Sequence, residues 1–103
     1  AMGEDEPGAR LYVELRKNLD EAEKLISKAM EIKPNDPYFT DSLGWLYYQK
    51  GDYVKAAEAY EAVLKVSGPT AVLYYNLGNA YFRMGEKGQA LLYYERARRL
   101  LPS

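Results

Sequence analysis

The chain has 103 residues and 48% of them are hydrophobic, so it has enough apolar residues to fold as one small domain. Its 14 basic and 15 acidic residues leave a net charge of −1, which argues against nucleic acid or a membrane surface as a partner. The sequence has no cysteine and no histidine, which excludes disulfides, thiol or imidazole catalysis and the ordinary zinc site. We therefore expect neither an enzyme nor a site for a metal or another cofactor.

The first eight residues, AMGEDEPG, show no apolar periodicity. Because Met2 follows Ala1, we interpret this beginning as a cloning remnant and expect residues 1–8 to form a disordered tail. On such a tail, the three acids would not be held in the shaped, partly dry pocket that carboxylate catalysis requires.

Two helical segments are expected before residue 36. Residues 9–17 are expected to form only a short first helix. The next segment carries Ala22, Ile26 and Ala29 on one face at three- and four-residue steps, and Pro34 closes it. The first unit of the chain is therefore expected to contain a helix pair.

Helix start and stop residues divide the rest of the chain. Asp36 followed by Pro37 fits an N-cap with proline at the first helical position. Gly51, Gly68 and Gly85 supply helix stops. The sequence therefore predicts helices near 37–50, 53–66, 70–84 and 87–100, joined by short loops.

The sequence repeats itself after 34 residues. "LGWLYYQKGD", which begins at Leu43, and "LGNAYFRMGE", which begins at Leu77, share the leucine, both glycines and the first of two aromatics. Trp45 does not recur, because Asn79 stands in its place. A period of this length indicates a solenoid in which each helix pair covers its neighbour.

These residues resemble those of a tetratricopeptide repeat (TPR) array. The family pattern appears at Leu43, Gly44, Tyr47, Ala56 and Tyr60, and again at Leu77, Gly78, Tyr81, Ala90, Tyr94, Ala97 and Pro102. The resemblance implies an all-α, right-handed superhelix of antiparallel helix pairs. Its units would be a degenerate first repeat at 9–36, a second at 37–70 and a third at 71–103 without a capping helix. In the first unit, Arg10 replaces the close-packing glycine.

The positions that vary between the repeats predict a binding groove. A step of two residues turns a helix by about 200°, so Trp45 points away from the face of Leu43 and Tyr47. In TPR arrays, the first helix of each pair lines a concave groove. The matching positions predict a peptide site at Tyr38, Asp41, Trp45, Tyr48, Gln49, Tyr75, Asn76, Asn79, Phe82 and Arg83.

Within this site, we expect the aromatic side chains to anchor a peptide and the asparagines and Arg83 to bind backbone amides or a carboxylate. The alternative is that some of these aromatics pack against the degenerate first unit. The expected partner is a protein or peptide of unknown identity, bound by an adaptor-like module.

Two narrower ligands are disfavoured. One TPR subset clamps the C-terminal carboxylate of chaperones, and Asn76 and Asn79 match positions of that clamp. However, Asp41 occupies a position where that clamp has lysine, and it would repel a carboxylate. The second ligand is nucleic acid, which the basic cluster "RARR", beginning at Arg96, could contact. This cluster lies in a final helical turn, where it complements the helix dipole, and the sequence offers no basic groove beside it.

Both ends of the expected array lack a capping helix. Apolar residues that a following helix would cover are Leu91, Leu92, Leu100 and Leu101. The alternative function is therefore a structural module, engineered or excised from a longer protein, that forms oligomers through its uncapped ends.

Overall fold

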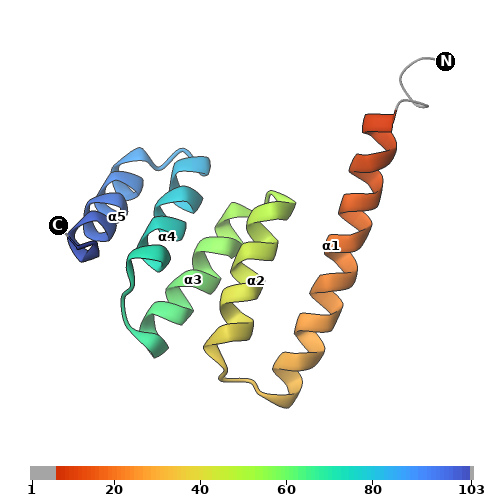
Figure 1. Ribbon diagram of the computed structural model, residues 1–103, viewed down its shortest axis with the longest axis horizontal. Helices are drawn as coiled ribbons and strands as arrows, with labels where there is room; N and C mark the ends of the chain where they lie inside the picture. The colour runs from red at the N-terminus through yellow and green to blue at the C-terminus, as the bar shows by residue number, and fades with distance from the viewer. Residues whose placement is uncertain (1–6, 103) are drawn as a thin grey trace.

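The computed structural model describes residues 7–102, and this part of the chain is all-α, with five helices and no strand. The helices are α1 (Pro7–Ile32), α2 (Pro37–Lys50), α3 (Tyr53–Ser67), α4 (Ala71–Arg83) and α5 (Lys87–Leu100) (Figure 1). Residues 1–6 of the expected tail lie outside the described residues, whereas Pro7 and Gly8 belong to α1.

The four predicted helices after residue 36 are confirmed to within one residue at each end. Local hydrogen bonds explain why they begin there. The Asp36 carboxylate accepts a hydrogen bond from the Tyr38 N–H at 2.9 Å, and the Thr70 hydroxyl accepts one from the Leu73 N–H at 3.1 Å. Gly51, with φ of +86°, ends α2 in the left-handed conformation that glycine adopts without steric cost.

The expectation of a short first helix and a separate second one is wrong, because α1 is a single helix of 26 residues. In the other two pairs, Gly51 and Gly85 turn the chain with φ of +86° and +83°. The residue 34 positions before Gly51 is Lys17. A side chain makes the left-handed conformation unfavourable by roughly 1–2 kcal/mol, so the helix continues through Lys17. The division into units at residues 36 and 70 stays a prediction.

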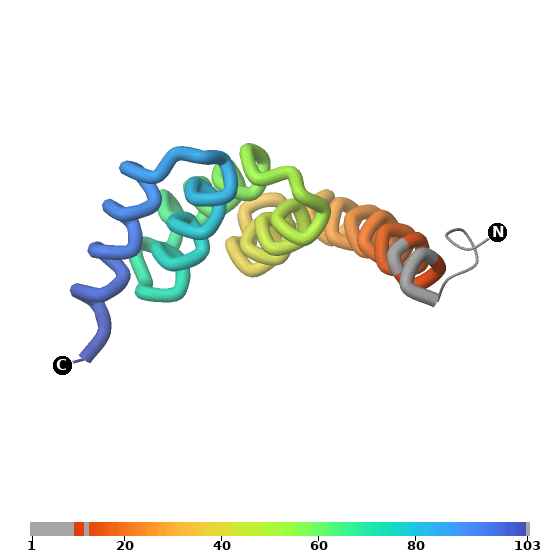
Figure 2. Tube along the Cα trace, turned by 90° about the horizontal axis from the view of Figure 1, so that it is seen from above, coloured from red at the N-terminus to blue at the C-terminus, as the bar shows by residue number. Residues whose placement is uncertain are grey.

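The helices follow one another in a curved row, with α1 and α5 at its two ends (Figure 2). Each helix packs against the next one along the chain. Gly44 and Gly78 allow the close approach within α2–α3 and α4–α5. A Cβ atom at Gly44 would lie 2.9 Å from Cε1 of Tyr60, and one at Gly78 would lie 2.5 Å from Cε1 of Tyr94. These contacts explain why glycine recurs at this position of both repeats.

The core lies between α2, α3, α4 and α5. The least exposed apolar side chains are those of Leu46, Ala56, Leu77 and Ala80. The ring of Tyr81 stacks on that of Tyr93 with centroids 5.6 Å apart, which fills the wider space between α4 and α5. The helices and their packing confirm the predicted all-α helical-repeat solenoid.

Candidate functional site

Trp45 lies on the open face of α2, and 54% of it is exposed to solvent. It borders three neighbouring hollows. Its side chain lines one of these hollows together with α1 residues, so the alternative in which aromatics of this face pack against the first unit stays open. Its indole is placed between α1 on one side and α4 on the other.

We call two of these hollows together the central hollow, because they share Trp45, Tyr60 and Asn76. The larger part has a volume of about 340 Å³ and the smaller about 180 Å³. Their walls are formed by Ala22, Ile26, Asp41, Ser42, Trp45, Leu46, Tyr48, Gln49, Tyr60, Asn76 and Asn79. Four helices therefore contribute to one recess.

The third hollow lies between the middle of α1 and the C-terminal half of α2, and we call it the α1–α2 hollow. Its volume is about 440 Å³. It is lined by Leu15, Arg16, Asn18, Leu19, Ala22, Trp45 and Gln49. Trp45 and Gln49 thus separate this hollow from the central one.

The polar groups of the central hollow differ in how they are engaged. Oδ1 of Asn79 accepts a hydrogen bond from the Tyr94 hydroxyl at 2.6 Å, which fixes the orientation of its amide. Partial burial raises the pKa of the Asp41 carboxyl above its ordinary value. Burial, followed by the nearby negative charge of Asp41, raises the pKa of Tyr60 to about 12. An acid that is exposed to solvent therefore lies at the edge of a mainly apolar wall.

Six of the ten predicted binding residues line the central hollow, namely Asp41, Trp45, Tyr48, Gln49, Asn76 and Asn79. The other four do not line any of the three hollows. Arg83 donates hydrogen bonds from Nε and Nη2 to the Tyr53 hydroxyl at 3.2 and 2.9 Å. Its guanidinium carbon also lies 5.2 Å from the Tyr53 ring centroid, so Arg83 is already engaged by α3.

The remaining three residues are exposed aromatics. Tyr38 packs edge-on against Phe39 with centroids 5.6 Å apart, and the Tyr75 ring lies 5.8 Å from that of Tyr94. Phe82 is 54% exposed. These positions keep the side chains on the surface without directing them into a recess.

Sequence reasoning missed the contribution of α1. Leu15, Leu19, Ala22 and Ile26 line the hollows from this helix. Their three- and four-residue spacing is visible in the sequence. Because two helices were expected before residue 36, Leu15 was assigned to one helix and Ala22 and Ile26 to the next, and the four were not recognised as one face. Tyr60, which was not among the predicted binding residues, also lines the central hollow.

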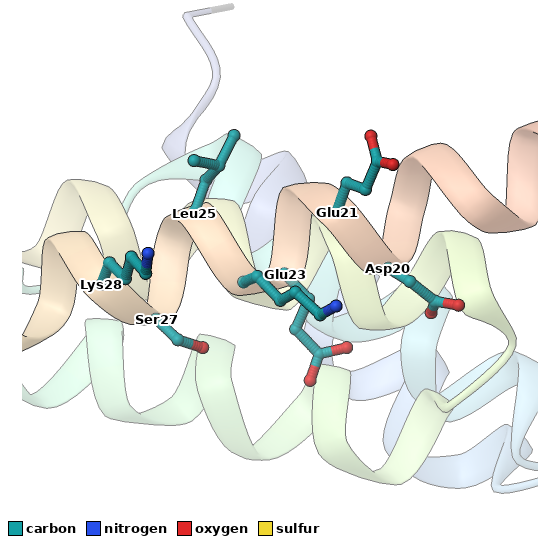
Figure 3. Close-up of a pocket in the computed structure, with 7 residues that line it drawn as sticks. Asp20, Glu21, Glu23, Leu25, Ser27 and Lys28 are labelled. Atoms are coloured by element: carbon teal, nitrogen blue, oxygen red, sulfur yellow. The ribbon is translucent and has the colours of Figure 1, made fainter.

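A further hollow, of about 850 Å³, is lined by residues of α1 alone, including Asp20, Glu21, Leu25 and Ser27 (Figure 3). In Figure 3, Leu25 and Glu21 project from one side of the helix, whereas Asp20 and Ser27 project from the other. Since no second helix supplies lining residues, this hollow is an open surface of one helix.

The acids of this surface have a structural partner. Nζ of Lys50, at the end of α2, lies 2.7 Å from Oδ1 of Asp20 and 2.7 Å from Oε1 of Glu23. The hydrogen bond and the charge of Lys50 hold the pKa of Asp20 below its ordinary value. Arg16 donates from Nη1 to the Lys50 carbonyl oxygen at 2.8 Å. These bonds attach the middle of α1 to the C-terminus of α2.

Within residues 7–102, no cluster of three or more acidic side chains is arranged to hold a metal ion. No helix in this part of the chain is long and apolar enough to cross a membrane. The four leucines predicted for self-association are all exposed, from 43% at Leu92 to 61% at Leu91. Their role stays a prediction.

Comparison with known proteins supports the assignment made from the repeat. A model described as "TPR repeat" matches residues 44–85, and one described as "Tetratricopeptide repeat" matches residues 71–103. Together they cover the region from the middle of α2 to residue 103.

Three relatives are similar over most of this chain. The human protein O-mannosyl-transferase TMTC1 is 31% identical over 94 residues, covering 84% of this chain and 10% of that protein. The mouse protein of the same name is 33% identical over 84 residues, with 75% and 9% covered. The anaphase-promoting complex subunit CDC16 of Saccharomyces cerevisiae is 31% identical over 81 residues, with 72% and 10% covered. The chain thus spans about a tenth of the length of these relatives.

Proposed function

Because this chain belongs to the tetratricopeptide repeat family, we propose that it binds a segment of a partner protein in the central hollow. Repeats of this family mediate protein–protein interaction and are typically non-catalytic. One of the relatives, CDC16, is by its name a subunit of a larger complex. The proposal places the function of this chain in the same class.

The observation that carries this proposal is the position of Trp45. A half-exposed indole on a rigid helix, bordered by hollows on both sides, provides a large contact area that water solvates poorly. Tyr48 adds a second aromatic wall. An apolar side chain of a bound segment would bury itself against this pair.

The polar groups of the central hollow favour an extended segment with a positive charge. The Asn76 amide, on the α4 side, can pair with a peptide group of a bound backbone. Asp41 lines the same hollow and is exposed to solvent, so a lysine or arginine of the ligand would pair with it. We therefore propose a partner segment with a bulky apolar residue next to a basic one, and not a free C-terminal carboxylate.

A peptide-display library with these two features in varied order provides the test. Enriched peptides are titrated into the protein while the emission of Trp45, the only tryptophan, is recorded. Trp45→Ala should weaken binding at least tenfold, because the main contact surface is lost. Tyr38→Ala is the matched control, since Tyr38 is exposed on the same helix and lines none of the three hollows.

The proposal fails if both alanine variants bind equally well. It also fails if no peptide is enriched over a library of shuffled sequences. Asp41→Asn separates the charge contribution, since it should weaken binding of the basic peptides and leave neutral analogues unaffected.

A second candidate function is assembly through the C-terminal end. Leu91 and Leu101 are 61% and 58% exposed, and a following helix or another copy could cover them. Light scattering across a dilution series tests this idea. Leu91→Glu with Leu101→Glu should abolish any association that increases with concentration, and a mass unchanged by both substitutions would rule it out.

A further inference from the structure

We propose that a second copy of the chain completes the N-terminal side of the groove, by placing residues 7–16 of its α1 beside Ala22 and Ile26. Each copy would supply this segment to the other, in a reciprocal exchange of one helix. This inference does not depend on peptide binding.

In the described part of the chain, one surface of α1 lacks the neighbouring helix that its counterpart in the next repeat has, and we call this surface the vacancy. Ala56 and Tyr60 of α3 are 0% and 3% exposed, and the Tyr60 ring packs against Gly44 of α2. The residues 34 positions earlier are Ala22 and Ile26, which are only half-buried and line the central hollow. Within residues 7–102, no helix therefore occupies on α1 the place that α2 occupies on α3.

The N-terminal part of α1 extends beyond the helix against which it packs, and we call this part the overhang. Arg16 bonds to the last residue of α2, Lys50, so residues 7–15 of α1 extend beyond the end of α2 by roughly 14 Å (Figure 1). This part carries Leu11, Val13 and Leu15, which are 60%, 63% and 52% exposed. A helix end with such side chains is better stabilised when another apolar surface covers it.

The repeat register connects the overhang with the vacancy. Residues 3–16 stand 34 positions before 37–50, which form α2. The overhang therefore corresponds in the repeat to α2, the helix that covers the equivalent surface of α3. It cannot reach the vacancy in its own chain without a turn at Lys17, where glycine is absent. Exchange between two copies makes the same contacts and leaves α1 straight.

Arg10 is compatible with this arrangement. Arg10 stands at the position of the first unit that is equivalent to Gly44. A Cβ at Gly44 would lie 2.9 Å from Cε1 of Tyr60. The ring is absent from the first unit, because Ile26 stands at the position of Tyr60. The shorter aliphatic side chain leaves room that a ring would fill.

Disulfide trapping tests the exchange, and the chain has no natural cysteine that would interfere. Arg10→Cys and Ile26→Cys are made as separate variants, because the matched pair Gly44 and Tyr60 is in contact. The two are mixed, unfolded, refolded together and oxidised. We expect a covalent dimer with one chain of each kind, formed well above the level of either variant alone. An absence of this mixed dimer overturns the proposal.

The double variant Arg10→Cys/Ile26→Cys identifies the competing arrangement. Exchange predicts dimers linked by two disulfides, even after tenfold dilution before oxidation. A crosslink within one chain would show that the segment folds back on its own α1, and it would overturn the proposal. Free thiols in the double variant would do so too.

A turn variant provides an independent check. Lys17→Gly with Asn18→Asp reproduces the Gly51-Asp52 pair that turns the chain between α2 and α3. It is compared with the parent sequence in a Leu91→Glu/Leu101→Glu background, in which the C-terminal end cannot associate. We expect the parent to have twice the mass of one chain and the turn variant to have the mass of one. Equal masses for the two overturn the proposal.

Discussion

Substitution of Gly78 by alanine is expected to destabilise the fold, although alanine favours a helix. The new Cβ would lie 2.5 Å from Cε1 and 2.6 Å from Cδ1 of Tyr94, well inside van der Waals contact. Tyr94 cannot rotate away freely, since its hydroxyl donates to Asn79 at 2.6 Å. Overpacking of this kind costs about 1–3 kcal/mol, whereas the helix propensity gained is about 1 kcal/mol. We expect a net loss of about 0–2 kcal/mol.

Gly88→Ala is the matched control. Gly88 lies in the first turn of α5, its φ is not positive, and a Cβ there would meet nothing within 4 Å. This variant should be stabilised by about 0.5–1 kcal/mol. The difference between the two variants isolates the contact with Tyr94, and it should amount to about 1–3 kcal/mol in urea unfolding.

The reasoning can also be tested through the ring itself. In a Tyr94→Leu background, Gly78→Ala should become neutral or stabilising, because the atoms that it contacts are gone. If Gly78→Ala raises the stability as much as Gly88→Ala in the natural background, the close approach of α4 and α5 is not as described.

Trp45→Ala should lower the free energy of unfolding by about 1–2 kcal/mol, below the 3–5 kcal/mol typical of a buried tryptophan, because the residue is 54% exposed; urea unfolding measures this. Lys50→Ala should reduce the acid sensitivity of the protein. Lys50 lowers the pKa of Asp20 in the folded state, so this pair stabilises the fold above the unfolded pKa near 4, and the stabilisation is lost as the pH falls below it. Thermal unfolding of the variant should therefore depend less on pH in this range. Burial and the charge of Glu61 raise the pKa of Tyr81 to about 12, so stability should be lost as the pH rises from the unfolded value of about 10 towards 12. Tyr81→Phe should weaken that loss of stability. Titration of tyrosinate absorbance at rising pH shows where the tyrosines are deprotonated.

Local signals explain why four helices could be predicted from the sequence. Asp36, Thr70 and the glycine stops act within one turn of the chain, so their effect does not depend on the rest of the fold. Gly44 differs, because its role depends on Tyr60 in the next helix. It could be predicted because the same glycine–tyrosine pair recurs after 34 residues as Gly78 and Tyr94.

The incorrect prediction of two helices in place of α1 followed from the 34-residue period, although no glycine near residue 17 signals a helix end. The repeat suggested a helix pair before residue 36, but Lys17 does not provide the turn that Gly51 provides. The absence of a glycine was visible in the sequence. Its consequence, an uninterrupted helix, follows from backbone sterics alone.

The composition of the binding site could be predicted only in part. Helix geometry places Trp45 and Asn76 on the open face, and both line the central hollow. The engagement of Arg83 by Tyr53 depends on where α3 lies relative to the end of α4, which no local rule gives. The wall contributed by Ala22 depends likewise on the unbroken course of α1.

The proposed use of the central hollow is tested most directly by nuclear magnetic resonance titration of the protein with an enriched peptide. The account predicts that the largest shifts occur at the Trp45 indole N–H and at the side-chain amides of Asn76 and Asn79, with smaller ones at Ile26. Shifts confined to Leu91, Leu100 and their neighbours in α5 would contradict it, because the ligand would then occupy the C-terminal end.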